Sequence, residues 1–511
     1  MHNLLKNTAL VTLFTAFEHF LGFLYRIILS RTLGAEGLGV YQAALAVFSV
    51  FLTAASSGLP VTLSRTISKH RANNLTKREH AAVTSAVLVS LAFSVPATVL
   101  LFIFRTPFTK IFADPRSADI FYIYLFGLSF TSLYTVIRGS FWGNKRFFAY
   151  SLIELVEEVS MITIGVVLIL VIPTGVSPVN KAAIALLASH LLSFALALVY
   201  YFIKGGKFAR PNGEFLPIVK SSLPVTAMRT SSSLINSLIS VIFPLRMLSA
   251  GFSSARAMGD YGVVYGMVMP VLMIPSTLIG SIALVLVPEL SECFYKKQKE
   301  KLAGLVEKAL NVTLLVAVML VPLFFVCGQS VGVFLFSDAT SGKMISACAL
   351  MLLPVSLTMI STSMLNSMGC EKQTLVFFLL GSAAMLLSVW FLPKLLGSGA
   401  LLVGMALDYL LTAVCSLALL LKKTGKIRTG KYFFKLLLAA LPAFALGYGL
   451  RTLLMRVLGY IPATLIVLVV MLLTEGVMLK ILKLFDAVAF VGKFLPKRKR
   501  RLGRKKVSAE K

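Results

Sequence analysis

Three carboxylates recur within one apolar stretch of the first half of the chain. Glu154, Glu157 and Glu158 would lie within about 100° of one another if residues 150–172 form a helix. Carboxylates this close cannot all carry a charge comfortably, which is typical of a site that couples to a proton or Na⁺. The alternative is ion pairing with the basic residues that precede this stretch: Arg138, Lys145 and Arg146.

A second polar group runs along the first apolar segment, residues 8–29. On a helix, its polar side chains fall within about 60° of one another: Thr8, Thr12, Thr15, His19, Arg26 and Ser30. Such a stripe is unsuited to lipid, so we expect it to face protein or a water-filled cavity. Glu18 in the same segment is a further candidate for ion coupling. The alternative for Arg26 is that its side chain reaches the membrane surface.

The segment at residues 221–245 carries a comparable stripe. Its members span about 80° of a helical wheel: Ser222, Thr226, Arg229, Ser233, Asn236 and Ser240. Local helix–helix packing also explains hydroxyl side chains in membrane helices. A membrane-depth arginine is costly, however, and favours a pathway or an anionic ligand.

Composition indicates the elements that must position these residues. The chain has 511 residues, of which 58% are hydrophobic and 14% charged, and its mean hydropathy is +0.88. A soluble domain would carry about a quarter charged residues, whereas apolar runs of about 20 residues, enough to span a bilayer, recur here throughout. We therefore predict an all-α polytopic membrane protein.

We expect about fourteen transmembrane helices. Their predicted ranges are 8–29, 39–63, 81–104, 119–138, 150–172, 182–203, 221–245, 261–287, 304–327, 344–368, 374–393, 399–421, 436–453 and 460–482. This count places both termini on one side. Loops on that side hold 36 Lys and Arg residues and the opposite loops hold 11, so we expect both termini to be cytoplasmic.

The basic excess follows this topology, which argues against a nucleic-acid partner. The net charge is +30, and its densest run, Pro496–Lys506, is typical of a cytoplasmic anchor attracted to anionic membrane lipids. The five cysteines are scattered, and neither a zinc site nor a cofactor is indicated. No nucleotide-binding loop or HExxH motif occurs, and the chain is not expected to be an enzyme.

Short motifs recur in the same order about 225 positions apart. Gly34–Tyr41 returns imperfectly as Gly259–Tyr265, and Ser140–Gly143 is echoed by Ser367–Gly369. Six predicted spans separate equivalent points, so we expect parallel repeats. The predicted units are two six-helix bundles at 1–210 and 211–430, a helix pair at 431–484 and a basic tail at 485–511. We interpret Gly34–Gly39 as a turn at the outer surface, and His190 as a packing residue.

Residues Phe23–Gln42, followed by Ser57–Pro60, resemble the start of the stage V sporulation protein B-type family of polysaccharide transporters. Phe243–Ser253 and Tyr261–Pro270 agree with that resemblance. This family belongs to the multidrug/oligosaccharidyl-lipid/polysaccharide exporter superfamily, with the lipid II flippases as distant relatives. The resemblance implies two bundles that alternate between inward- and outward-open states and move a lipid-linked saccharide across the bacterial cytoplasmic membrane.

The first hypothesis for function is therefore a flippase for an undecaprenyl-diphosphate-linked oligosaccharide, including peptidoglycan precursors. Arg26 and Arg229 would attract the diphosphate, while polar side chains would bind the sugars: Asn236, His19, Thr15 and Ser233. H⁺ or Na⁺ coupling would use Glu18, Glu154, Glu157 and Glu158. The alternatives are a cation-coupled multidrug antiporter of the same superfamily and a membrane glycosyltransferase, which would need catalytic acids in a large external loop.

Overall fold

The computed structural model describes residues 2–173, 175–211, 213–425 and 427–484, without the side chains of residues 2–10 and of residues 277, 278, 281, 282, 284, 285 and 288. These described residues form helices and no strand, which confirms the all-α class. The predicted basic tail at 485–511 and the side chain of Thr8 lie outside the described part.

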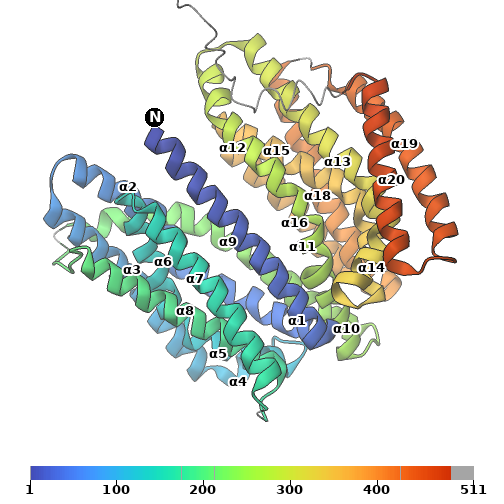
Figure 1. The fold of residues 1–511 in the computed structure, drawn as a ribbon. Coiled ribbons are helices and arrows are strands. Elements are labelled where there is room, and N and C mark those ends of the chain that lie inside the picture. The colour runs from blue at the N-terminus through green and yellow to red at the C-terminus, as the bar shows by residue number, and fades with distance from the viewer. Residues whose placement is uncertain (1, 174, 212, 426, 485–511) are drawn as a thin grey trace, which may run out of the picture.

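The helices form two groups, and α1 is the member of the first group that lies toward the second (Figure 1). The first group comprises α1 (His2–Ser56), α2 (Leu59–Ala72), α3 (Thr76–Ile103), α4 (Arg105–Thr109), α5 (Pro115–Phe126), α6 (Leu128–Gly143), α7 (Phe147–Val166) with the π-helical η1 (Val167–Val171), and α8 (Pro178–Ile203). We call it the N-half.

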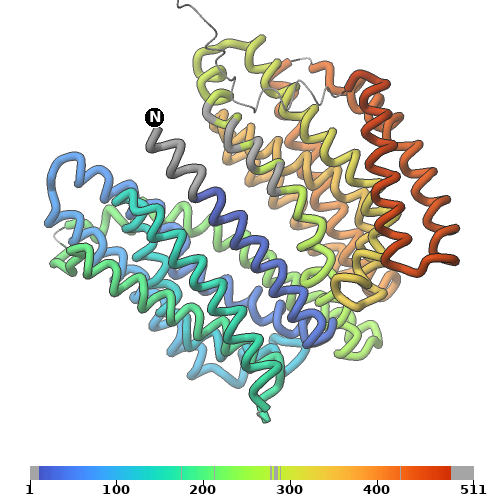
Figure 2. The backbone as a smooth tube through the Cα atoms, in the orientation of Figure 1, coloured from blue at the N-terminus to red at the C-terminus, as the bar shows by residue number. Residues whose placement is uncertain are grey.

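The second group, the C-half, follows in chain order. It comprises α9 (Phe215–Ser249), α10 (Ser254–Gly262), the π-helical η2 (Val263–Val268), α11 (Met269–Leu272), α12 (Ile274–Tyr295), α13 (Lys299–Phe336), α14 (Ala339–Cys348), η3 (Ala349–Met351), α15 (Leu352–Ser367), α16 (Glu371–Phe391), α17 (Pro393–Leu396) and α18 (Gly399–Thr424). The pair α19 (Thr429–Leu454) and α20 (Tyr460–Ile481) packs on α13 at the outer edge of the C-half (Figure 2).

The predicted count of fourteen spans is not confirmed. By length and composition, the described residues contain 11 helices able to cross a membrane, or up to 12 if the bent pair α5–α6 forms one span. Two features explain why fewer than fourteen helices are counted. The run Val11–Ala72 is counted once, although its 62 residues would extend about 90 Å, far more than one bilayer thickness. Helix α7 is not counted, and it carries three glutamates.

The turn predicted over Gly34–Gly39 is confined to a single residue. Only Gly34 leaves the helical conformation, with φ 69° and ψ −179°, and the helix continues on both sides of it. Glycine adopts this positive φ without the steric cost that a Cβ would bring. The two predicted spans 8–29 and 39–63 are therefore two arms of α1 that meet at a kink, and residues 37–41 beyond it are buried.

The two repeated motifs contact each other across the two halves. A Cβ built on Gly39 would lie 1.9 Å from the Met258 carbonyl oxygen, and one built on Gly262 would lie 2.1 Å from the Ala35 carbonyl oxygen. Helix backbones approach this closely only where both surfaces lack side chains, as small-residue crossings in membranes do. Figure 1 shows the halves meeting at this crossing and diverging toward the N-terminus of α1. We call these the closed end and the open end.

Polar contacts add to the closed end. The Arg31 guanidinium donates to the Leu335 carbonyl oxygen at 2.8 Å and also to that of Phe334, at the C-terminal end of α13. These carbonyls lack helical partners, so a cation there is favourable. Ser254 at the start of α10 donates to the Asp114 carboxylate at 3.4 Å.

Helix α9 is attached to both halves. Near its start, the Thr226 hydroxyl accepts from the Gly58 N–H at 3.1 Å. Near its end, Arg246 Nε donates to the Trp390 carbonyl oxygen at 2.9 Å. The connection before α9 is bound to α3, because the backbone N–H groups of Lys207 and Ala209 donate to His80 and Thr84. The start of α9 thus packs with the N-half, and the predicted boundary at residue 211 stays a prediction.

We predict that Gly262→Ala destabilises the protein, because the new methyl group would meet the Ala35 carbonyl oxygen and the Gly39 backbone, which cannot rotate away as a side chain could. Overpacking of this kind costs about 1–3 kcal/mol. The check is the thermal unfolding midpoint of the detergent-solubilised protein. Gly259→Ala is the matched control, since the nearest atom to its Cβ is 4.0 Å away. Equal midpoints for the two variants would contradict the close crossing.

Candidate functional site

A cleft of about 740 Å³ lies between the two halves. One wall comes from α1 and α7 of the N-half: Thr15, Glu18, His19, Gly22, Phe23, Arg26, Tyr150, Glu154, Glu157 and Glu158. The other wall comes from η2, α11 and the start of α12: Tyr265, Met269, Pro270, Met273, Ile274 and Ser276. The first wall is mostly polar and charged, and the second is mostly apolar.

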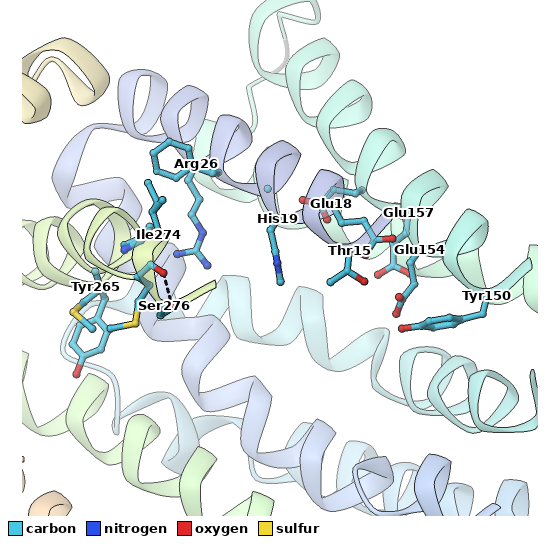
Figure 3. A pocket seen from close by; sticks show the side chains of 16 residues that line it. Thr15, Glu18, His19, Arg26, Tyr150, Glu154, Glu157, Tyr265, Ile274 and Ser276 are labelled. Atoms are coloured by element: carbon cyan, nitrogen blue, oxygen red, sulfur yellow. Dashed lines mark hydrogen bonds between the residues drawn. The ribbon is translucent and has the colours of Figure 1, made fainter. Parts of the chain in front are cut away.

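The structure thus brings together the polar residues predicted on two separate segments. Thr15, His19, Glu18 and Arg26 line the cleft from α1, and the three glutamates line it from α7. Gly22 permits this approach, because a Cβ there would lie 2.8 Å from Glu158 Oε1. Figure 3 shows Arg26 beside Tyr265 and Ser276 at one end, the carboxylates with Tyr150 at the other, and His19 between them.

At the carboxylate end, one glutamate has a direct cationic partner. Arg138 of α6 donates to Glu154 Oε1 at 2.7 Å, and both side chains are less than a third exposed. The guanidinium also lies over the rings of Trp142 and Tyr150. The ion-pairing alternative therefore describes Glu154. Glu18 and Glu157 each keep one buried carboxylate oxygen without a hydrogen-bond partner among the described residues.

At the other end, Arg26 is available to a ligand. It forms no ion pair or hydrogen bond with any residue that the structure describes, and Glu158 of α7 is the carboxylate whose charge acts on it. Glu36, a possible partner, is bound instead to Arg116 at the start of α5. Arg26 lies two helical turns before the Gly34 kink, so its charge is close to the closed end. A guanidinium in that position can attract an anionic group that enters from the open end.

The stripe predicted on residues 221–245 does not line this cleft. Arg229 Nη1 donates to the Ser57 carbonyl oxygen at 3.1 Å, beside the Gly58–Thr226 contact, so helix packing accounts for both side chains. Asn236 borders a separate pocket of about 70 Å³ with Tyr265, Asp408 and residues of α16. Ser233 is half-buried and borders neither cavity. The assignment of these three residues to substrate binding stays a prediction.

Two parts of the site were missed from the sequence. The apolar wall carries few polar residues, so only the proline-rich pattern of Pro270 and Pro275 marked it. His190 of α8, interpreted as a packing residue, lies against Glu157 with its Nε2 3.5 Å from Oε1. A lone histidine in an apolar stretch gives no signal of this contact, because the spacing of residues along α8 does not show which residue of α7 each of them meets.

We predict that Arg138→Gln destabilises the protein strongly, because it leaves the Glu154 charge unpaired beside three other carboxylates. Loss of one partner from a buried pair costs about 3 kcal/mol or more. The double variant Arg138→Gln/Glu154→Gln should recover most of the loss. The measurement is the free energy of unfolding in mixed micelles.

Asp119→Asn is the control for this prediction. It removes the exposed pair between Asp119 and Arg105, whose closest atoms are 3.7 Å apart, and should change stability by less than about 1 kcal/mol. Strictly additive effects of the two α6–α7 substitutions would show that the buried pair has no coupling energy.

Comparison with known proteins places the chain. Stage V sporulation protein B of Bacillus subtilis (strain 168) is 25% identical over 344 residues, a match spanning 63% of this chain and 64% of that protein. Lipid II flippase MurJ of the same organism is 21% identical over 476 residues, covering 86% of this chain and 87% of the flippase. A solved structure of lipid II flippase MurJ in an inward closed conformation superposes with a TM-score of 0.68 at 14% identity, covering 96% of this chain and all of that one.

The similarity to stage V sporulation protein B confirms the resemblance inferred from Phe23–Gln42. The superposition shows a shared fold, which is that of a multi-pass membrane protein. Residues 4–294, more than half of the chain, match the model of one family. This chain belongs to the polysaccharide biosynthesis protein family.

Proposed function

We propose that the protein is a flippase that moves a lipid-linked oligosaccharide of the undecaprenyl-diphosphate type across the bacterial cytoplasmic membrane. The observation that carries the proposal is the cleft, which joins a polar, charged wall to an apolar wall. A lipid-linked saccharide has the same two-sided chemistry, since its head is polar and anionic and its chain is apolar. A peptidoglycan precursor is one such molecule.

Each wall has a part in binding. Arg26 would attract the diphosphate by charge-assisted hydrogen bonds. His19 and Thr15, about two and three helical turns from Arg26 toward the open end, would hydrogen-bond to sugar hydroxyls. Met269, Met273 and Ile274 would contact the first isoprene units of the lipid. Arg229, Ser233 and Asn236 lie outside the cleft in this conformation and would join the site only if α9 moves.

The family and two named relatives support this proposal. The chain belongs to a polysaccharide biosynthesis family, and its relatives include a sporulation protein and a lipid II flippase. The chain matches less than two thirds of the length of stage V sporulation protein B. The proposed substrate therefore rests on the chemistry of the two walls of the cleft.

Alternating access is the mechanism that we propose for the two halves. The Gly39–Gly262 crossing and the Arg31 contacts seal the closed end, while the cleft extends toward the open end. If the termini are cytoplasmic, this conformation faces inward. Transport then requires the contacts at the closed end to break as the open end closes.

A second candidate is a cation-coupled multidrug antiporter. It is favoured by the charge of the polar wall, where four carboxylates face the single arginine that lines the cleft. Such a wall would attract a cationic drug as well as a coupling ion. The two functions differ in which residue is indispensable, because an anionic substrate needs Arg26 and a cationic one does not.

We predict that Arg26→Gln lowers translocation of a fluorescent undecaprenyl-diphosphate disaccharide in proteoliposomes by at least about tenfold, since a charge-assisted bond contributes about 1.5–3 kcal/mol. Arg256→Gln is the matched control, because that arginine lies on α10 outside the cleft and is largely exposed. Wild-type translocation by Arg26→Gln would refute the anion site. Efflux of ethidium that survives Arg26→Gln would favour the antiporter.

We further predict cytoplasmic termini, from cysteine labelling in a background without the five native cysteines, all buried or half-buried. Gln298→Cys, between α12 and α13, should react with a membrane-impermeant maleimide only in inverted vesicles. Val176→Cys, between η1 and α8, should react only in intact cells. Both positions are exposed. The reverse pattern would invert the orientation and make this conformation outward-facing.

A further inference from the structure

A buried chain of three side chains leads from the cleft into the N-half. Glu157 of α7 lines the cleft, and its Oε1 lies 3.5 Å from His190 Nε2 of α8. On the far side of the ring, His190 Nδ1 lies 3.3 Å from the Thr131 hydroxyl of α6. Glu157 and His190 are 22% and 17% exposed, so both groups are largely shielded from water.

The Thr131 hydroxyl favours hydrogen on one of the two ring nitrogens. A hydroxyl has one proton, and the Thr131 oxygen lies 3.0 Å from the Gly127 carbonyl oxygen, one helical turn back. Donation to that carbonyl leaves the hydroxyl oxygen to accept from His190, which favours hydrogen on Nδ1. In the neutral ring, Nε2 is consequently an unprotonated acceptor that faces the Glu157 carboxylate.

Two acceptors facing each other repel, so this contact requires one more proton. It can reside on the carboxyl group, which then donates to Nε2, or on the ring, which then donates to the carboxylate. The second Glu157 oxygen, Oε2, is buried, and the Ser193 hydroxyl beside this carboxyl group already donates to the Ser189 carbonyl oxygen at 2.9 Å, so a fully ionised carboxylate would be costly there. We propose that Glu157 and His190 together bind one proton, held by the Thr131 contact, and that this proton is the coupling ion of the transporter.

The charges around the pair come from three helices. Helix α1 contributes Glu18, and α7 itself contributes Glu154 and Glu158. Helix α6 contributes Arg138, which is already paired with Glu154, and the Tyr134 hydroxyl, which has no hydrogen-bond partner among the described residues. Acidic groups outnumber basic ones, so a bound proton reduces the net negative charge of the polar wall. Loss of the proton would return a repulsive pair to the α7–α8 interface.

The coupling role rests on the proposed transport function, whereas the proton site does not, and the two are measured separately. The site is tested on full-length protein in nanodiscs, without substrate, by ¹⁵N NMR of labelled histidines during a pH titration. We expect neutral His190 to carry its hydrogen on Nδ1. Glu157→Gln should lower the proton affinity of His190 at least about tenfold, because the carboxylate that favours the charged ring is gone.

Two variants make this test specific. Thr131→Val removes the acceptor of the Nδ1 hydrogen and should shift neutral His190 toward the Nε2–H tautomer. His70→Gln is the matched control. His70 is also buried and faces a carboxylate, that of Glu214 at 3.1 Å, but it lies in the last turn of α2 and takes no part in the contacts of His190. It should leave the His190 titration unchanged. A wild-type Nε2–H tautomer, or a His190 titration indifferent to Glu157→Gln, would overturn the proton site.

The coupling role is tested in proteoliposomes with the fluorescent undecaprenyl-diphosphate disaccharide and an imposed pH gradient. His190→Gln should abolish the acceleration caused by the gradient and leave translocation without a gradient measurable. Acceleration equal to wild type, or acceleration by a Na⁺ gradient in its place, would overturn proton coupling at this pair. Absence of any translocation by the wild-type protein would instead refute the proposed function and leave the NMR result standing.

Discussion

The shape of the cleft depends on how closely two helix backbones approach at one point. At Gly39 and Gly262 no side chain separates α1 from α10, and any Cβ would overlap a backbone atom of the other helix. Because the halves are in contact here and diverge toward the open end, the space between them widens into the cleft. The residues that line it from α1 all lie before the Gly34 kink, on the arm that extends from this contact. A pair of glycines thus determines where Arg26 and the carboxylates face the opposite wall.

Burial of charge divides the cleft into two unlike ends. Near the open end, Arg138 compensates Glu154, and the other carboxylates lie close enough to affect one another. Near the closed end, Arg26 has no ion pair or hydrogen bond among the described residues and interacts only electrostatically with Glu158 of the same wall, whereas Arg31 and Arg116 are engaged in structural contacts. A charge at membrane depth is expensive to maintain. An anionic ligand in the cleft would stabilise Arg26 further.

The sequence predicted the class of the protein and the residues of one wall, because both rest on local patterns. Apolar length identifies membrane helices, and helical spacing placed Thr15, Glu18, His19 and Arg26 within one segment. That α1 and α7 would face the same cleft could not follow from either pattern. Arg229 has the same spacing signal as Arg26, yet it binds the Ser57 backbone, since only three-dimensional packing distinguishes a liganding arginine from a structural one. The Gly34–Gly39 turn was predicted too long for a related reason: several glycines predict a turn, whereas here Gly34 alone forms the kink and Gly39 serves a close helix crossing.

The double attachment of α9 has a mechanical consequence. Its start is held to the N-half by Thr226 and Arg229 and by the linker before it, which is bound to α3. Its end is held to the C-half by Arg246. The linker is already bound and cannot lengthen to absorb a rotation between the halves. Under the proposed alternating access, the deformation would fall within α9 itself, between residues 230 and 245, where Pro244 lacks one backbone hydrogen bond. The bending stiffness of this helix would then set the work needed to exchange one opening for the other.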